Sequence, residues 1–368
     1  MNCADIVVAG SGPAGLAVAL AARNAGMTVL LADSARPPID KACGEGLMPD
    51  AIAALARLGA DDLRACEGVA FRGIRFLGHG VSVNATFRDG VGLGIRRTKL
   101  HTLLTERAVA AGVECRWGSP VTAIEKGVVV AGEERVAYKY LVGADGANSS
   151  VRKMAGLNSW SRNGLRLGFR RHYRIEPWSD YVEVHWGADT QLYVTPVSAD
   201  CVCVALLVRD SKLRLDQALD RYPEVAARLR HAVPVGPERG GSSAFRRLHR
   251  VVNGNIALVG DASGSVDAVT GEGMSLSFRQ AAALSEAISH DRLEEYQQAH
   301  ERLRVGPDRM TSLLLMMDQS PVLCRRALRA LANRPEVFSR MLEMHVGEPS
   351  RLRMAGALWS LGWGLLTA

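Results

Sequence analysis

The sequence predicts a mixed α/β fold, in which a largely parallel, doubly wound sheet is interleaved with an antiparallel β domain and followed by C-terminal helices. Three observations predict it. A glycine-rich loop lies between two apolar strands near the N-terminus, two later apolar strands each end in an aspartate, and an alternating, β-branched segment lies between these two. With 368 residues the chain is too long for one simple core, so two entwined domains are expected.

The glycine-rich loop at residues 10–15, GSGPAG, has the full context of a dinucleotide-binding fingerprint. A short apolar strand at residues 6–9 precedes the loop, and a helix rich in small residues follows it. A second apolar strand at residues 28–32 then ends in Asp33. Strand, loop, helix, strand and acid in this order make the fingerprint specific, but they do not separate FAD from NAD.

Each residue type in the fingerprint has a physical role. Gly10 permits the tight turn, Gly12 lets a pyrophosphate approach the backbone, and Gly15 lets the helix pack closely on the strand. The helix N-terminus offers free N–H groups and a partial positive charge to the phosphates. A carboxylate at the end of the second strand accepts hydrogen bonds from ribose hydroxyls. The predicted cofactor-binding residues of this region are Gly10, Gly12, Pro13, Ala14, Gly15 and Asp33.

Two later segments repeat the pattern of an apolar strand that ends in an aspartate. The strand in KYLVGADGANSSVRK ends at Asp145, and the strand in NIALVGDASGSVDAVTGEGMSLSF ends at Asp261. In the second segment Gly271 and Gly273 open a helix whose N–H groups can face a ligand. Either aspartate alone could be a turn or cap residue. Together with Asp33 they predict one elongated ligand that touches three strand ends.

The motifs GSGPAGL, GADGANSSVRK and GDASGSVDAVTGEGM, in this order, resemble the FAD-dependent monooxygenase superfamily of the para-hydroxybenzoate hydroxylase fold. Within it the chain is most similar to the branch that holds geranylgeranyl reductases, flavin-dependent halogenases and related hydroxylases. The resemblance covers the chain to about residue 290. It implies a Rossmann-type FAD-binding domain, with FAD as the cofactor and NAD(P)H as the electron donor.

The resemblance also assigns residues to the cofactor. It places Ala14, Asp33 and Val121 at the ADP half of FAD, and Arg97 near its ribityl chain and phosphates. It assigns Asp145 and Arg152 to a motif that holds the fold and is linked with NAD(P)H use in some relatives. The second group of FAD contacts that it implies is Asp261, Gly271, Gly273 and Met274.

The loop Cys43-Gly44-Glu45-Gly46 matches a CGG-type loop that lines the flavin in geranylgeranyl reductases. The two glycines let the backbone approach the ring. Cys43 has three interpretations: an inert packing residue, a proton donor or redox thiol, and a covalent flavin link. Glu45 either caps the helix expected near Pro49 or holds a proton for the substrate. Cys43 and Glu45 are the catalytic candidates, and Cys43 and Gly44 are also counted among the cofactor contacts.

The reaction is predicted from the segment at residues 181–208, which alternates like antiparallel strands. Its piece QLYVTP shares with geranylgeranyl reductases only an aromatic residue and a proline, so Tyr193 and Pro196 are the substrate candidates. A halogenase-type lysine is missing, because no lysine occurs between Lys41 and Lys99. We therefore expect a monooxygenase that hydroxylates an apolar or aromatic small molecule through a flavin C4a-hydroperoxide. The alternatives are a reductase of prenyl or polyene double bonds and a flavoprotein that modifies a partner protein.

Composition limits the partners and the location. The formal charge of +7 comes from scattered arginines rather than a basic run with aromatics, which argues against nucleic acid. Neither a signal peptide nor an apolar run long enough to span a bilayer is visible, so a cytoplasmic location is expected. Apolar residues at 312–319 and in the tail at 357–368 suggest a pocket for a lipid-tailed phenol, quinone or polyketide, and peripheral membrane contact through the C-terminus. A helical core or a docked C-terminal helix explains the same residues.

The expected domain boundaries follow from these assignments. The FAD-binding domain is discontinuous, at residues 1–68, 91–155 and 250–290. The β-rich substrate domain takes residues 69–90 and 156–249, and residues 291–368 form a C-terminal helical region.

Overall fold

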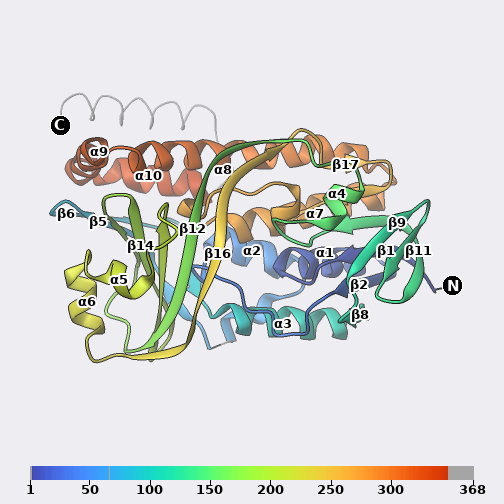
Figure 1. Ribbon diagram of the computed structural model, residues 1–368, viewed down its shortest axis with the longest axis horizontal. Coiled ribbons are helices and arrows are strands. Elements are labelled where there is room, and N and C mark those ends of the chain that lie inside the picture. Colours follow the sequence, from blue (N-terminus) through green and yellow to red (C-terminus); the bar gives the residue numbers. More distant parts are fainter. Residues whose placement is uncertain (1, 66, 347–368) are drawn as a thin grey trace.

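The computed structural model describes residues 2–65 and 67–346, and it contains two large sheets that meet at the middle of the molecule (Figure 1). The first has 8 strands in the order β17-β18-β11-β1-β2-β8, with β10 and β9 continuing from β11. The pairs β18/β11, β11/β1, β1/β2 and β2/β8 are all parallel. The strands are β1 (Asn2–Ala9), β2 (Val29–Asp33), β8 (Glu114–Trp117), β9 (Val121–Glu125), β10 (Val128–Ala131), β11 (Glu134–Gly143), β17 (Val252–Asn253) and β18 (Ile256–Leu258).

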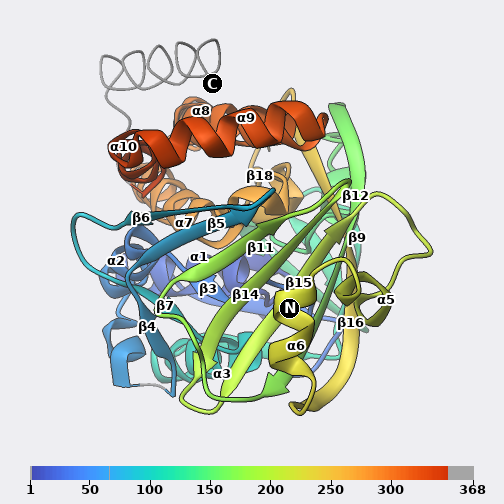
Figure 2. The same ribbon diagram turned by 90° about the vertical axis from the view of Figure 1, so that its left-hand side faces the viewer.

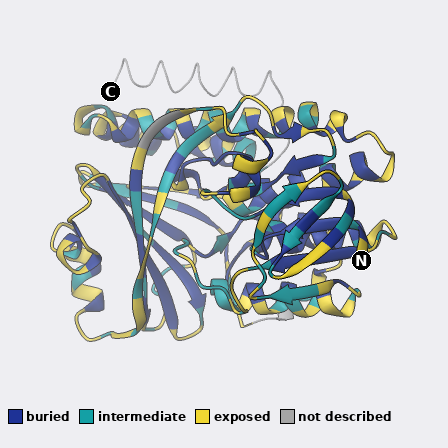
Figure 3. Ribbon diagram, turned by 45° about the vertical axis from the view of Figure 1, so that its right-hand side comes forward, coloured by how far each residue is buried: buried dark blue, intermediate teal, exposed yellow. Residues whose placement is uncertain are grey.

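This first sheet is buried because helices cover its faces. The central residues Ile6, Val7 and Val8 of β1 are inaccessible to solvent, as expected for a parallel strand that reads as a continuous apolar run. Helix α1 (Pro13–Asn24) packs against α7 (Gly273–Ser289) and α3 (Arg97–Ala110). In the burial map the inner strands are dark, whereas the outer strands β8 and β9 are intermediate or exposed (Figure 3).

The second sheet has 7 strands in the order β16-β12-β15-β14-β13-β5-β6. It is antiparallel apart from the β13/β5 pair. This parallel pair joins the strands of residues 73–86 to the strands of residues 160–248 in one sheet. The predicted antiparallel strands at 181–208 are confirmed. The strands are β5 (Gly73–Gly78), β6 (Val81–Thr86), β12 (Trp160–Arg174), β13 (Val182–Trp186), β14 (Thr190–Ser198), β15 (Cys201–Val208) and β16 (Val233–Leu248).

A small sheet of 3 strands connects the two halves, in the order β3-β7-β4. It holds β3 (Gly46–Leu47), β4 (Val69–Phe71) and β7 (Gly92–Gly94). The loop that contains Cys43 and Glu45 runs directly into β3, so this sheet fixes where the loop lies. Helix α2 (Pro49–Arg57) follows β3 and begins where the sequence predicted, at a proline that suits the first helical position.

Three consecutive helices, α8 (Glu294–Asp318), α9 (Pro321–Asn333) and α10 (Pro335–Val346), run across one side of the second sheet (Figure 2). Helices α9 and α10 pack on β5 and β6, where Phe76, Leu328 and Phe338 share a core, and α8 packs on α7 and α9. The predicted C-terminal helices are thus confirmed to residue 346, and the tail at 357–368 lies outside the described residues. The other described helices are α4 (Ser150–Met154), α5 (Leu215–Leu219), α6 (Pro223–Leu229) and the 3-10 turns η1 (Asp61–Ala65), η2 (Gly260–Ser263) and η3 (Ala268–Thr270).

Candidate active site

A cavity of about 720 Å³ extends from the fingerprint loop to the C-terminal helices, between the two large sheets. One end is polar and is built from the loops after β1, β2, β11 and β18. The other end is apolar and is lined by side chains of the second sheet and of α8 and α10. The three predicted strand ends therefore border one continuous cavity.

The fingerprint glycines lie where close backbone approach requires them. Gly10 has a φ of +102°, and a Cβ there would lie 2.5 Å from the carbonyl oxygen of Ala144. A Cβ on Gly15 would lie 1.9 Å from the carbonyl oxygen of Gly10. At Gly12, by contrast, a Cβ would meet nothing within 4 Å. Gly10 and Gly15 serve the packing of strand and helix, whereas Gly12 borders open cavity at the N-terminus of α1, where a phosphate fits.

Asp33 lies at the end of β2 and is held by the fingerprint loop. Its Oδ2 atom accepts hydrogen bonds from the backbone N–H and the hydroxyl of Ser11, at 2.6 and 2.8 Å. His101 supports the same loop from α3, with Nε2 2.9 Å from the Ser11 carbonyl oxygen. Burial lowers the pKa of His101, so the neutral imidazole donates this bond. Asp33 is thereby held at the cavity wall, and its contact with a ribose stays a prediction.

Arg97 and Val121 line the polar end from opposite sides. Arg97 is the first residue of α3, and its Nε atom is buried with no hydrogen-bond partner among the described residues. A buried guanidinium donor without a partner fits an anionic ligand such as the FAD pyrophosphate. The backbone N–H groups at Gly12 and the Arg97 guanidinium are donors that fit the FAD phosphates. The Asp33 carboxylate is an acceptor that fits its ribose.

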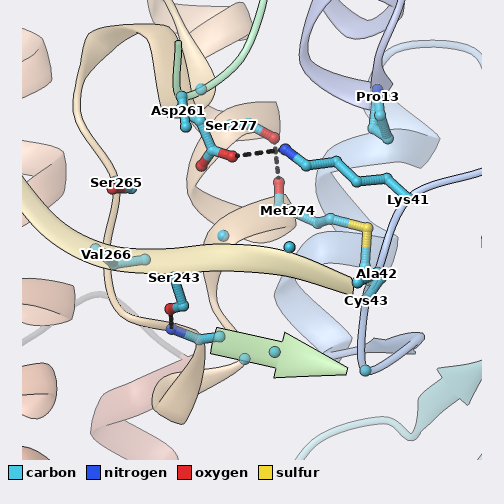
Figure 4. A pocket seen from close by; sticks show the side chains of 18 of the residues that line it. Pro13, Lys41, Ala42, Cys43, Ser243, Asp261, Ser265, Val266, Met274 and Ser277 are labelled. Carbon is cyan, nitrogen blue, oxygen red and sulfur yellow. Dashed lines mark hydrogen bonds and ion pairs between the residues drawn. The ribbon is translucent and has the colours of Figure 1, made fainter. Parts of the chain in front are cut away.

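Asp261, at the last of the three predicted strand ends, lies at the cavity and pairs with Lys41. The Lys41 ammonium nitrogen lies 3.5 Å from Asp261 Oδ2, and the lysine side chain extends across the cavity to reach it (Figure 4). Nearby, Gly271 adopts the left-handed conformation with φ of +69°, and Gly273 is the first residue of α7. Gly271, Gly273 and Met274 all line the cavity, so the N-terminus of α7 faces it.

Asp145 and Arg152 hold the fold. Asp145 Oδ2 accepts the backbone N–H groups of Ser150 and Val151, which caps α4. The buried Arg152 guanidinium donates to the carbonyl oxygens of Ala147 and Ala262, at 2.8 and 3.1 Å. Arg152 therefore links the loop after β11 to the loop after β18, which fixes two walls of the cavity relative to each other.

Glu45 has a structural role that differs from the cap predicted for it. One carboxylate oxygen accepts the backbone N–H of Arg97 at 2.9 Å, so Glu45 serves the first turn of α3 rather than α2. The other oxygen lies 2.5 Å from Nε2 of His172. The cap near Pro49 was wrong because Glu45 has a φ of 61°, which turns its side chain into the interior between the loop and β12.

His172 belongs to a buried cluster that also contains Arg170 and Cys203. Arg170 donates to His172 Nδ1 at 3.1 Å, so the imidazole carries its proton on Nε2 and donates it to Glu45. Although Glu45, His172 and Cys203 have potential metal-ligand atoms within 4.8 Å, the Glu45 and His172 atoms already have protein partners. Burial raises the pKa of Cys203 well above its usual range, so its sulfur is a neutral thiol. The cluster is a hydrogen-bonded support for the loop.

Cys43 and Gly44 line the cavity beside this support. The backbone N–H of Glu45 points at the Cys43 sulfur, at 3.4 Å. The thiol of Cys203 lies 3.7 Å from the Cys43 carbonyl oxygen, which fixes the loop from behind. The loop thus forms part of the cavity wall, and its contact with a flavin stays a prediction.

The two substrate candidates lie in different surroundings. Tyr193 on β14 lines the cavity, and its hydroxyl donates to the Val269 carbonyl oxygen at 3.1 Å. Burial raises the pKa of this phenol above its usual value, which keeps it neutral. Pro196, by contrast, lies outside the cavity lining, and its carbonyl oxygen packs on Gly94 of β7.

The apolar end was only partly foreseen, because its residues come from strands and helices far apart in the chain. Leu314 of α8 does lie in it, as the apolar residues at 312–319 suggested, and so does Met310, which precedes that run. The strand residues and the α10 residues carried no motif. The side chains that line this end are Ile74, Phe76, Val182, Val184, Leu207, Met310, Leu314, Phe338, Met341 and Leu342.

Comparisons with known proteins support FAD as the cofactor. Residues 3–184 match the family described as FAD binding domain. A menaquinone reductase of Mycolicibacterium smegmatis is 28% identical over 324 residues, which cover 80% of this chain and 79% of that protein. The 12-dehydrotetracycline 5-monooxygenase/anhydrotetracycline 6-monooxygenase of Streptomyces rimosus is 34% identical over 165 residues, 42% of this chain and 33% of that protein. A flavoprotein/dehydrogenase structure from Cytophaga hutchinsonii has a TM-score of 0.83 at 17% identity, covering 94% of this chain and 93% of that one.

Fold and cavity define a flavoprotein oxidoreductase whose cofactor is FAD. Residues 3–184 carry the FAD binding domain, and the relatives of the chain include monooxygenases and a digeranylgeranylglycerophospholipid reductase, as its three motifs indicated.

Proposed function

We propose that the protein is an FAD-dependent monooxygenase that hydroxylates an apolar or aromatic small molecule. The observation that carries this proposal is the continuity of the cavity, which joins the dinucleotide cradle to an apolar end of strand and helix side chains. The relative from Streptomyces rimosus is a monooxygenase and is the more identical of the two relatives described above. A cavity of about 720 Å³ lies within the range that suits small-molecule ligands.

The residues that would hold FAD are those whose groups lack protein partners or border open cavity. Gly12 and the N-terminus of α1 would receive the phosphates, and Arg97 would donate to them. Asp33 and Asp261 would accept from the ribose and ribityl hydroxyls. FAD when bound would supply the redox chemistry and the reaction with oxygen. The chain would orient the substrate against it and exclude water, since apolar side chains surround the far end.

NAD(P)H is our proposed electron donor. The sequence contains one complete dinucleotide fingerprint, which the FAD site uses, so a nicotinamide cofactor would bind transiently at the cavity mouth rather than in a second domain. Lys41 is placed to meet an anionic group there, because its side chain is 48% exposed in the ion pair with Asp261.

The test is consumption of NADPH and oxygen by the yellow holoprotein with a panel of alkyl phenols, quinols and aromatic polyketides. We expect a substrate to stimulate both and to gain one oxygen atom, with heavy oxygen from O₂ and not from water found in the product. Stimulation without oxygen incorporation would overturn the proposal.

Reduction of a prenyl or polyene double bond is the second candidate. It is favoured because the relative that aligns along four-fifths of this chain is a menaquinone reductase. Reduced holoprotein, mixed anaerobically with menaquinone or a geranylgeranyl compound, would then oxidise its flavin and saturate one double bond. A hydroxylase would show no turnover without oxygen, so the same vessel distinguishes the two reactions.

A protein substrate is the third candidate. It is disfavoured because the apolar end of the cavity is buried.

No helix in residues 2–65 and 67–346 is long and apolar enough to cross a membrane. A cytoplasmic location and peripheral contact with a membrane surface stay predictions. Sedimentation with anionic vesicles would test the contact.

A further inference from the structure

Glu272 is a buried acid at the N-terminus of α7 that does not cap the helix. It immediately precedes α7, where a carboxylate ordinarily accepts hydrogen bonds from the first turn of the helix. Its side chain makes no such bond, although it is only 3% exposed. Its Oε2 atom has no hydrogen-bond partner among the described residues. A buried polar atom without a partner requires an explanation.

The explanation lies on α10. His345 Nδ1 is 3.5 Å from Glu272 Oε2, and neither atom has another partner in the described part of the chain. His345 Nε2 lies 2.9 Å from the carbonyl oxygen of Thr270, and a carbonyl oxygen only accepts. Nε2 therefore carries the imidazole proton, and Nδ1 presents its lone pair to Glu272. This geometry suits a protonated Glu272, since an ionised one would set two acceptors against each other.

The charges around the pair favour the same protonation state. Burial, the largest influence, raises the pKa of Glu272 to about 8, with Asp50 of α2 and Asp308 of α8 acting in the same direction and Arg279 of α7 opposing them. Burial also lowers the pKa of His345 to about 4. At neutral pH the pair is therefore a neutral acid beside a neutral imidazole.

The pair adjoins the cavity. His345 lines it, as do Thr270, Gly271 and Gly273 on either side of Glu272. Met341, one turn earlier on α10, belongs to the apolar end. His345 therefore stands where the N-terminus of α7 meets the space assigned to the substrate.

We propose that Glu272 and His345 are a proton-donating pair that serves the small molecule in the apolar end of the cavity. In the proposed step the Nε2 proton of His345 leaves its hydrogen bond with the Thr270 carbonyl oxygen and passes to an anionic oxygen or carbon of that molecule, whose electron pair forms the new bond to hydrogen. Nδ1 takes the proton of Glu272, which is left as a carboxylate near Arg279. After the product leaves, Nδ1 returns this proton to Glu272 and solvent reprotonates Nε2, which restores the resting pair. Glu272 is thus a positioning and storage residue that acts through His345. This inference rests on the proposed function only for the origin of the anionic centre.

The first experiment needs no turnover. Infrared spectra of the resting holoprotein, titrated in H₂O and D₂O, should show a protonated carboxyl band that disappears as the pH rises through about 8. Glu272→Gln should remove this band. Glu286→Gln, the same change at an exposed position of α7, should leave it. Absence of the band in the natural protein, or its persistence in Glu272→Gln, would overturn the pair.

The second experiment tests delivery. Glu272→Gln and His345→Phe should each lower kcat by roughly 10²-fold at unchanged FAD content, and the double variant should be no slower than either. The decline of kcat above about pH 8 and the solvent isotope effect should vanish in Glu272→Gln. Unchanged kcat and pH profile in Glu272→Gln, with turnover of the natural protein intact, would refute delivery. If the natural protein turned over no substrate, the proposed function would fail, and the infrared titration alone would decide the pair.

Discussion

Oε2 of Glu45 lies 2.5 Å from Nε2 of His172, and the two side chains are almost completely buried beside the loop that lines the cavity. The other Glu45 oxygen accepts the first N–H of α3 at Arg97. One carboxylate thus joins the cavity loop, the helix that carries Arg97 and strand β12 of the second sheet. This arrangement keeps three parts of the site in place.

Removing that carboxylate should loosen all three parts. We expect Glu45→Ala to lower the free energy of unfolding by about 3 kcal/mol, because it leaves the Nε2 atom of His172 without its acceptor and removes one of the two carboxylates that pair with the buried Arg170. Glu45→Gln keeps one acceptor oxygen and should cost about 1–2 kcal/mol. Urea unfolding measures both. Exposed Glu176→Ala is the control, and an equal loss there would argue against the role of Glu45.

The fingerprint glycines should separate folding from cofactor binding. Gly12→Ala meets no protein atom, so the apoprotein should unfold within about 1 kcal/mol of the natural protein. FAD should nevertheless bind at least about tenfold more weakly, because the added methyl occupies phosphate space. Gly15→Ala would press on the Gly10 carbonyl and should reduce soluble, folded protein. Circular dichroism and FAD titration test the contrast, and tight FAD binding by Gly12→Ala would contradict it.

Arg97→Ala should weaken FAD binding by about 10- to 100-fold, because the variant lacks the guanidinium whose Nε has no partner among the described residues. The loss should shrink as salt is added. Lys99→Ala removes the same charge from the exposed side of α3, where Lys99 pairs with Glu67, and should bind FAD normally. Fluorescence titration of the apoproteins measures both constants. Equal weakening in the two variants would indicate a general charge effect.

Filling the apolar end should affect the substrate and spare the cofactor. Met310→Trp places a larger ring in the lining, so KM should rise by about tenfold or more while FAD content stays stoichiometric. Met316 lies on the same helix, outside the lining and 41% exposed, so Met316→Trp is the matched control. Loss of FAD from Met310→Trp, rather than a change in KM, would place the cofactor at this end.

Glu272→Gln should also change the pH dependence of stability. In the natural protein the unfolded chain releases the Glu272 proton near its ordinary pKa of 4.5, whereas the folded protein keeps it to about 8. The protonated acid therefore stabilises the fold fully below 4.5, and this contribution is lost as the pH rises to about 8. Glutamine does not titrate, so the variant should gain stability over the natural protein across this window. Thermal unfolding at stepped pH measures the difference, and a constant difference would contradict the raised pKa.

The polar half of the site was predictable because phosphate and ribose recognition depends on residue type at short spacing. Gly10, Gly12, Asp33 and Asp261 were named from local motifs and Arg97 from the family resemblance, and the structure brings all five to one cavity. The domain boundaries and the individual catalytic roles stay predictions. The sequence analysis wrongly expected Pro196 at the substrate cavity. A proline shared with relatives does not determine which face of the sheet that strand residue lines.

His172 and His345 escaped the sequence analysis because a histidine without a motif shows nothing of its partners. Glu45 and His172 are 127 residues apart, and no sequence pattern predicts their contact. Glu272 was quoted within a motif, but its burial and its missing cap bond depend on α10, which carries no motif.

The sequence by itself determined that this chain builds a dinucleotide cradle and three ligand-facing strand ends, since local backbone geometry and residue type encode those features within a few residues. Only the tertiary structure decided which distant side chains meet at the buried loop and at the apolar end. Burial, and with it the protonation of Glu272 and His345, is a property of the packed molecule.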